Sequence, residues 1–297
     1  MDHHHTTDGV AVTPFVISHA RMLEQPGQRS TVANRSDSPI AGDASYYEGQ
    51  DLHALADIPR YYAWILDYFH PHLRGKVIEI GAGLGNISSH YVDFAQDVLL
   101  VEPAENLHAQ LKQRFESKPH VRTICALMET VQADATISPG THGAPFDSAL
   151  MVNVLEHVFD EASILKRIRD ILRPQGMLLV FVPALPWLYG TLDKKVGHER
   201  RYTRRRLFQV IEQAGFSIES IRYFDFPGIL PWLFAGRVRR VEDFPEGGAK
   251  LYDRLVVPFA RAIETRIKPP IGKNLLCIAR ATGQGELNEN RASPTTA

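Results

Sequence analysis

Short apolar runs alternate with helix-like patterns through the middle of this chain, and this alternation limits the folds that it can adopt. The apolar runs are residues 77–80, 98–101, 121–126, 146–152 and 177–182, with helical patterns near Asn86, Leu107 and Asp160 between them. Strands that are apolar along their whole length are buried on both faces, and the intervening helices connect parallel strands. The pattern predicts an α/β fold with a doubly wound, mostly parallel sheet and helices on both faces.

The 297 residues divide into segments of different character. Residues 1–45 are polar and aperiodic and are expected to form a flexible arm, and residues 46–72 have amphipathic helical spacing with a break at Pro59. The predicted later boundaries are a core at 73–224, an insertion at 225–273, a final core strand at 274–281 and a flexible tail at 282–297.

Charge and hydropathy exclude several classes of protein. The 33 Lys and Arg residues balance 34 Asp and Glu residues, so no global field favours nucleic acid as a partner. The longest apolar run, residues 177–190, contains two prolines and is shorter than the roughly 20 residues that span a bilayer, which excludes stable membrane insertion. Because the first residues also lack the pattern of a secretory signal, a cytoplasmic protein is expected.

The two cysteines and the N-terminal histidines give no sign of a metal site. Cys125 and Cys277 lie in apolar, strand-like segments, so two buried thiols are expected rather than a disulfide or a zinc site. His3 to His5 lie in a polar terminus with no scaffold to make them converge on an ion.

A glycine-rich turn follows the first predicted strand. Glu79 is followed by Gly81, Gly83 and Gly85 in the pattern E-x-G-x-G-x-G. Glycine lets the backbone approach a ligand closely, although the same turn also serves tight packing of a strand against a helix. The spacing differs from the G-x-G-x-x-G of dinucleotide-binding proteins, which disfavours an NAD-type oxidoreductase. A P-loop pattern is absent from the sequence.

Polar residues also follow the second and fourth predicted strands. Glu102 stands about 20 residues beyond the glycines, where a carboxylate can accept hydrogen bonds from a ribose diol. Asn153, Glu156 and His157 follow the strand at 146–152, and ligands of doubly wound sheets bind at this carboxyl edge. Together, these residues indicate a site for a ligand that contains a nucleoside.

Taken in order, these segments resemble the successive motifs of the class I S-adenosylmethionine-dependent methyltransferases. The likeness is carried by the glycine turn, Glu102, the segment 147–157 that ends in V-L-E-H, and L-R-P-Q-G at 172–176. It covers residues 76–224 and a last strand at 274–279. The resemblance implies a seven-stranded sheet with an antiparallel last strand, S-adenosylmethionine as cofactor and S-adenosylhomocysteine as product.

The resemblance also implies which residues contact the cofactor. Glu79 and the glycines would bound its methionine end, Glu102 would hold the ribose, Met128 and Glu129 would lie against the adenine, and Asn153 would face the acceptor. The predicted cofactor-binding residues are Glu79, Gly81, Gly83, Gly85, Asn86, Glu102, Pro103, Met128, Glu129 and Asn153.

Methyl transfer by in-line displacement requires the protein to align the acceptor atom with the methyl group. For a neutral acceptor, the protein must also provide a route that removes a proton. That logic requires no metal, and none is expected. His198 and His157 lie in acceptor-side segments and are the candidate bases, with His198 preferred. The alternative for each histidine is a hydrogen bond to the backbone that fixes a loop.

A dense group of arginines follows His198, in the sequence G-H-E-R-R-Y-T at 197–203, which is similar to an element of a subgroup of bacterial methyltransferases. Either Arg200 or Arg201 is hypothesised to bind an anionic acceptor, such as a carboxylate or phosphate, the alternative being a solvated, salt-bridged helix start. Aromatic residues of the insertion would line a pocket, pack as core or touch a membrane surface. The candidate acceptor-binding residues are Arg200, Arg201, Tyr202 and Trp232.

The sequence therefore predicts an enzyme that moves a methyl group from S-adenosylmethionine to an O or N atom of a small molecule. The acceptor classes considered are secondary metabolites, sugars and lipid-linked compounds. The alternatives are a protein methyltransferase and a catalytically inactive scaffold that binds the cofactor or a partner. Neutral charge and the absence of an N-P-P-[YF] or D-P-P-Y tetrapeptide disfavour nucleic acid as acceptor.

Overall fold

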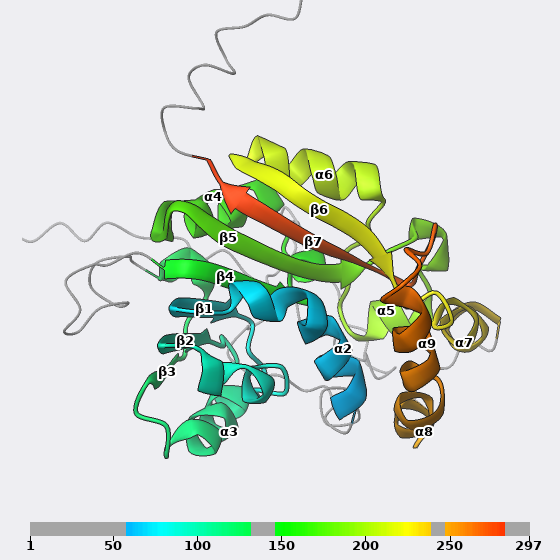
Figure 1. Ribbon diagram of the computed structural model, residues 1–297, viewed down its shortest axis with the longest axis horizontal. Coiled ribbons are helices and arrows are strands. Elements are labelled where there is room, and N and C mark those ends of the chain that lie inside the picture. The colour runs from blue at the N-terminus through cyan, green and yellow to red at the C-terminus, as the bar shows by residue number, and fades with distance from the viewer. Residues whose placement is uncertain (1–57, 132–145, 239–246, 283–297) are drawn as a thin grey trace, which may run out of the picture.

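Seven strands form one central sheet in the computed structural model, which describes residues 58–131, 146–238 and 247–282 (Figure 1). The strands are β1 (Lys76–Ile80), β2 (Asp97–Val101), β3 (Val121–Ile124), β4 (Phe146–Val152), β5 (Leu172–Pro183), β6 (Phe216–Phe224) and β7 (Asn274–Ala281). Their order is β3-β2-β1-β4-β5-β7-β6. Strand β7 runs antiparallel to both of its neighbours, whereas the pairs among β1 to β5 are parallel. The predicted doubly wound sheet with an antiparallel last strand is confirmed.

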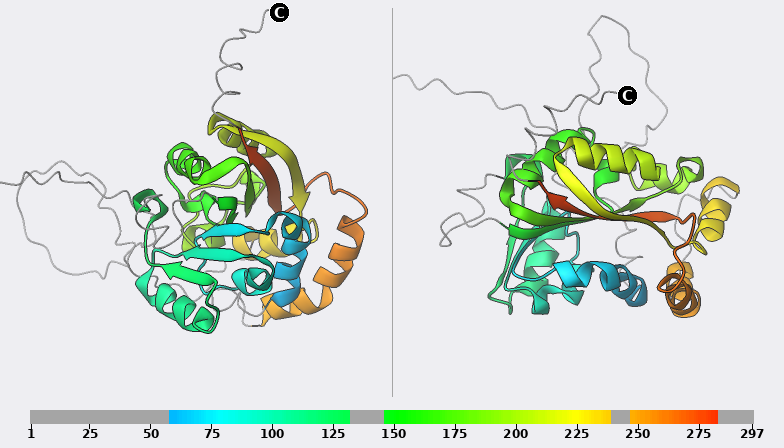
Figure 2. Two further views of the ribbon diagram at one scale, coloured as in Figure 1. Left: turned by 60° about the vertical axis from the view of Figure 1, so that its left-hand side comes forward. Right: turned by 45° about the horizontal axis from the view of Figure 1, so that its top comes forward.

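Helices cover both faces of this sheet, as the two further views show (Figure 2). On one face, apolar residues of the strands pack with α4 (Glu161–Ile171) and α6 (Arg204–Gln213). On the other face, the alternate strand residues pack with α2 (Pro59–Phe69), α3 (Glu105–Phe115) and α9 (Val257–Glu264). Two-sided burial explains why the strands are apolar at successive positions.

Local signals set the helix boundaries. Asp160 accepts a hydrogen bond from the Ser163 N–H at the start of α4, and Thr203 accepts one from the Arg206 N–H at the start of α6. Pro59 is the first residue of α2, a position where its missing N–H costs nothing.

The remaining elements are α5 (Thr191–Lys195), α7 (Ile229–Leu233), α8 (Gly248–Leu255), the π-helix η7 (Phe234–Val238), and the 3-10 turns η1 (His70–His72), η2 (Ser88–His90), η3 (Val92–Phe94), η4 (Met128–Thr130), η5 (Leu155–His157) and η6 (Pro186–Leu188).

Two local predictions are wrong. The helix expected from Asn86 is replaced by the short turns η2 and η3, because Ser88 and Tyr91 hold their hydroxyls against the buried carboxylate of Glu79. Cys125 is exposed, since β3 ends one residue before it, while Cys277 is buried as expected. The predicted arm at 1–45, residues 46–57 and the tail from residue 283 lie outside the described residues.

The segment between β6 and β7 is tied to the core by two buried acids. Asp225 accepts a hydrogen bond from the Tyr61 hydroxyl at 3.0 Å and pairs with Lys273 at 3.0 Å. Glu264, near the end of α9, accepts hydrogen bonds from the backbone N–H groups of Asp225 and Phe226. The Tyr252 hydroxyl of α8 also contacts Asp225, and both α8 and α9 lie beside α2 (Figure 1). Within the described part of the chain, none of the helices is long and apolar enough to cross a membrane.

Candidate active site

A cavity of about 670 Å³ opens at the carboxyl ends of β1, β2, β4 and β5. Residues of α2 and α8 and of the segment around Trp232 complete its walls. Cavities of roughly 300–1,000 Å³ at this edge of a doubly wound sheet are typical of small-molecule and cofactor sites.

Most of the sequence-predicted residues line this single cavity. Its lining includes Glu79, Gly81, Gly83, Asn86, Glu102, Pro103, Met128, Asn153, His157, His198, Arg201 and Trp232. Gly85, Arg200 and Tyr202 are not part of the lining, and the side chain of Glu129 lies outside the description. The cavity therefore brings the cofactor candidates and both candidate bases together.

The carboxylate of Glu79 lies at the end of β1 and is 3% exposed. Its Oε2 accepts hydrogen bonds from the Ser88 hydroxyl at 2.6 Å and from the Tyr91 hydroxyl at 2.8 Å. Burial raises the pKa of Glu79 to about 7, although both hydrogen bonds act to lower it. Glu79 is thus a buried acid with one carboxylate oxygen that the protein itself satisfies.

The carboxylate of Glu102 bridges the glycine turn and the start of α3. Its Oε2 accepts the Gly83 N–H at 2.8 Å, and its Oε1 accepts the Ala104 N–H at 3.0 Å. Burial raises the pKa of Glu102, while these two backbone hydrogen bonds lower it. Each carboxylate oxygen has a further lone pair, so Glu102 can also accept hydrogen bonds from a ligand's hydroxyls.

The glycines of the turn serve different purposes. Gly81 has φ 69° and lines the cavity, and a Cβ there would lie 2.5 Å from a methyl group of Val154. Gly85 has φ 74°, and a Cβ there would lie 2.5 Å from the ring of Phe115. Gly85 is therefore needed for packing against α3, whereas Gly81 is needed at the wall of the cavity.

Asn153 follows β4 in a left-handed conformation, with φ 53°. A positive φ is uncommon for residues other than glycine and is tolerated best by Asn and Asp. Its N–H donates to the carbonyl of Phe181 at 2.8 Å, which fixes the turn between β4 and η5 at the cavity wall.

On the side of the cavity formed by segments that follow β4 and β5, His198 lies in a network of buried charges. Its Nδ1 is 2.9 Å from Oδ1 of Asp193, which also accepts from the Arg201 Nε at 2.7 Å. The pKa of Asp193 is lowered because His198 and Arg201 together outweigh the effect of its burial. An ionised carboxylate only accepts hydrogen bonds, so Nδ1 of His198 is the donor and the lone pair of the neutral ring is on Nε2.

His157 and Glu156 complete this end of the site. Nδ1 of His157 is 3.0 Å from the carbonyl oxygen of Gly197, which makes Nδ1 the donor here too. The two imidazole rings lie edge to face, with centroids 4.9 Å apart. Glu156 is fully buried, and burial raises its pKa to about 7. Neither of its carboxylate oxygens has a hydrogen-bond partner among the described residues.

The hypothesised anion-binding residues are engaged with the protein's own acids. Arg201 pairs with Asp193, and Arg200 lies 3.2 Å from Glu161 and donates to the carbonyl of Val158. Tyr202 is fully buried, and its hydroxyl contacts Glu161. These contacts fix residues 200–202 against α4 and η5, and neither Arg200 nor Tyr202 lines the cavity.

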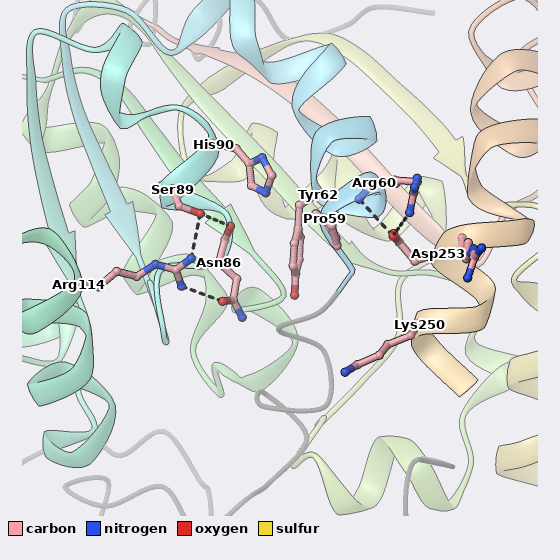
Figure 3. A pocket seen from close by; sticks show the side chains of 10 residues that line it. Pro59, Arg60, Tyr62, Asn86, Ser89, His90, Arg114, Lys250 and Asp253 are labelled. Atoms are coloured by element: carbon pink, nitrogen blue, oxygen red, sulfur yellow. Dashed lines mark hydrogen bonds and ion pairs between the residues drawn. The ribbon is translucent and has the colours of Figure 1, made fainter. Parts of the chain in front are cut away.

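A separate, basic recess of about 550 Å³ lies between α2, α3 and α8 (Figure 3). Four cationic side chains line it: Arg60, Arg114, Lys250 and Arg254. Asp253 is the one acid in the described lining, and its carboxylate accepts the Tyr61 N–H at 2.7 Å. The recess adjoins the cavity, because Tyr62, Asn86 and Asp253 line both.

Sequence reasoning missed three residues of the site, which are Asp193, Lys273 and Tyr61. Asp193 orients His198. Lys273 and Tyr61 line the cavity, with Nζ of Lys273 5.1 Å from the ring of Tyr61. Asp193 stands five residues before His198 and could have been suspected as a carboxylate partner for it. No local signal marks Lys273 or Tyr61, since they reach the cavity only through the pairing of distant segments.

Comparison with known proteins identifies related sequences and folds. A family model described as "Methyltransferase domain" matches residues 52–221. Fumosorinone synthetase of Cordyceps fumosorosea is 32% identical over 111 residues, which are 36% of this chain and 3% of that protein.

Solved structures share the fold. One is an S-adenosylmethionine-dependent methyltransferase from Clostridium acetobutylicum, with a TM-score of 0.51 and 9% identity over 79% of this chain and 96% of that one. Another, from Bacillus halodurans and assigned as a methyltransferase, has a TM-score of 0.50 and 18% identity over 75% of this chain and 99% of that one. At such identities the likeness concerns the fold alone.

Proposed function

The chain belongs to the methyltransferase-domain family and is a class I S-adenosylmethionine-dependent methyltransferase, and from that premise we propose that it methylates an O or N atom of a small molecule. The observation that carries the proposal is one cavity lined by two chemically distinct groups of residues. The glycine turn and Glu102 form one group, which we call the cofactor end, and His157 and His198 form the other, which we call the acceptor end.

The residues of the first end fit the cofactor. Gly81 and Gly83 present backbone without side chains, so a ligand can approach the turn closely. Glu102 is held by the Gly83 and Ala104 N–H groups with acceptor capacity left for a ribose diol. Glu79 would bound the methionine end, and Met128 would supply an apolar contact for the adenine. When bound, S-adenosylmethionine supplies a methyl group on a sulfonium, which is already an activated leaving group.

The other end handles the acceptor. An attacking O–H or N–H must lose a proton as its bond to the methyl carbon forms. His198 is oriented by Asp193 and His157 by the Gly197 carbonyl, and both line the cavity. We assign to these two histidines the activation of the acceptor, and to Trp232 a place in its wall.

The borders of the cavity suggest an acceptor with an apolar body and an acidic group. Leu251 and Leu255 of α8 line the cavity and are 59% and 53% exposed. The adjoining basic recess is lined by Lys250 and Arg254, whose positive charges suit a carboxylate or phosphate. A secondary metabolite or lipid-linked compound of this chemistry fits better than a neutral sugar.

Calorimetric titration tests the cofactor. We expect micromolar binding of S-adenosylmethionine and S-adenosylhomocysteine, no binding of NAD, and loss of binding in Gly83→Arg, whose side chain would fill the turn. A preference for NAD would overturn the assignment, and cofactor binding without turnover across a wide acceptor panel would favour an inactive scaffold.

A charge-removal pair tests the acceptor. The double variant Lys250→Ala/Arg254→Ala should lower kcat/KM for acidic acceptors about tenfold, leave that for their neutral amides unchanged, and keep cofactor affinity. Lys268→Ala removes an exposed cation outside the recess and is the matched control. Equal losses for acidic and neutral acceptors would contradict recognition of an anion.

A further inference from the structure

We infer that Glu156, His157 and His198 form a binding site for a divalent metal ion at the acceptor end of the cavity. One ligand atom from each residue lies within 4.8 Å of the other two. This inference rests on the proposed function only for the role of the ion, because the site itself is defined by the three side chains.

The carboxylate of Glu156 is the first reason. It is fully buried, yet within the described chain both of its oxygens lack hydrogen-bond partners. Nε2 of His198 is 3.6 Å from Oε1 of Glu156, which exceeds hydrogen-bond distance. A buried carboxylate without a partner is unfavourable, and metal coordination is one of the ways in which proteins compensate it.

The orientation of the two imidazoles is the second reason. Nδ1 of His198 donates to the Asp193 carboxylate and Nδ1 of His157 donates to the Gly197 carbonyl, so the lone pairs of both neutral rings are on Nε2. Histidine ligands of metal ions have this same arrangement, in which the second ring nitrogen donates to a carboxylate or a backbone carbonyl. The outer contacts that would fix the ligands are therefore already present.

Only a small adjustment is needed to close the site around an ion. Ligand atoms about 2.1 Å from a common ion lie roughly 3–4 Å apart, so the 4.8 Å limit requires shifts of about 1 Å. Both histidines also line the cavity, which leaves one side of the ion open to an acceptor. The η5 turn and the segment after α5 are joined by the Glu199 N–H, which donates to the Glu156 carbonyl at 3.0 Å.

The donor set indicates the kind of ion and its use. Two imidazole nitrogens and one carboxylate with open positions suit first-row divalent ions such as Mn²⁺, Fe²⁺, Co²⁺ and Zn²⁺. An ion there would bind a hydroxyl or phenol of the acceptor and lower its pKa, so that an oxygen atom would be the methylated position. The two histidines would then hold the ion, and the acceptor's proton would pass to water. The O–CH3 bond would form as the bond between the methyl carbon and the sulfonium breaks.

Cobalt titration of the 297-residue chain tests the inference. The protein is first treated with a chelator, and His3, His4 and His5 are replaced by alanine so that the N-terminal histidines cannot bind the ion. We expect one equivalent of Co²⁺ to bind, with visible d–d absorption bands that report nitrogen and oxygen ligands. Zn²⁺ should displace it.

Variants localise the site. Glu156→Gln, His157→Gln and His198→Gln should each weaken Co²⁺ binding at least tenfold and reduce the absorption bands. His108→Gln removes a partly buried histidine of α3 that is hydrogen-bonded to Thr123 of β3, and it should leave binding unchanged. Melting curves identify any variant that fails to fold, and the three ligand variants provide independent tests.

Cofactor calorimetry separates this inference from the proposed function. If wild-type protein binds S-adenosylmethionine but binds no Co²⁺, or if Co²⁺ binding persists in Glu156→Gln and His198→Gln, the metal site is overturned and the methyltransferase assignment stands. In that case a proton shared by Glu156 and His198 is the explanation for the carboxylate. If Co²⁺ binds but the cofactor does not, the proposed function fails alone.

Discussion

Two buried glutamates differ in their hydrogen bonds: Glu79 lines the cofactor end of the cavity, and Glu156 lies beside His157 and His198 of the acceptor end. Glu79, at the cofactor end, accepts hydrogen bonds from Ser88 and Tyr91. Glu156, at the acceptor end, has no such partner within the described residues. Burial raises the pKa of both to about 7. Side chains of the protein therefore hold the carboxylate of Glu79, whereas Glu156 is a polar group that a ligand would satisfy.

The largest expected effect concerns cofactor binding at the cofactor end. Glu102→Ala should weaken S-adenosylmethionine binding about 10- to 100-fold, because it removes a charged acceptor for two hydroxyls and releases the Gly83 N–H. Calorimetry measures the loss. Glu105→Ala, three residues along and exposed, removes the same charge from the start of α3 and should change affinity less than about twofold. Equal losses would mean that Glu102 acts only through long-range charge.

Stability measurements can test whether the two glutamates differ in their hydrogen bonds to the protein. Tyr91→Phe removes a buried donor to Glu79 and should lower the free energy of unfolding by about 1–3 kcal/mol. Glu156→Gln removes no protein hydrogen bond and should cost less than about 0.5 kcal/mol in the presence of chelator. Urea denaturation of both variants measures the difference. A large loss in Glu156→Gln would show that its carboxylate has a protein partner after all.

The order of the strands and the cofactor end could be predicted from sequence because both depend on local patterns. Apolar runs predict the strands, and the glycine turn with Glu102 lies within one strand-helix-strand stretch. The helix expected after Gly85 failed because its Ser and Tyr residues make tertiary hydrogen bonds to Glu79. Helix propensity depends on the local sequence and does not reveal hydrogen bonds to a buried side chain of a neighbouring strand.

The acceptor end could be predicted only in part, because it is assembled from distant segments. His157 and His198 were recognised as candidates, but Glu156 comes close to His198 only when residues 193–203 pack on η5. The arginines hypothesised to bind an anion instead pair with Glu161 and Asp193. The pair of Arg200 with Glu161 joins segments far apart in sequence, and such a contact leaves no periodic signal, whereas strands and helices do.

The smallest expected effect is a pH dependence of stability that arises at the cofactor end. Burial raises the pKa of Glu79 from its ordinary value of 4.5 to about 7 in the folded protein. Between these values the folded state holds more protons than the unfolded state, so the contribution of Glu79 to stability is present at low pH and is lost as the pH rises towards 7. The loss should be about 1 kcal/mol between pH 6 and pH 7.

Other buried acids, including Glu264, titrate in the same range, so the informative quantity is the difference between wild type and Glu79→Gln. The variant keeps an oxygen that can accept from Ser88 or Tyr91, but it cannot ionise. Its free energy of unfolding should fall less steeply between pH 6 and pH 7 than that of the wild type. Parallel curves would mean that Glu79 is ionised throughout this range, because its two hydroxyl donors then outweigh its burial. The cofactor end would in that case present a permanent negative charge to the cationic end of the cofactor, and the contrast with Glu156 would be greater still.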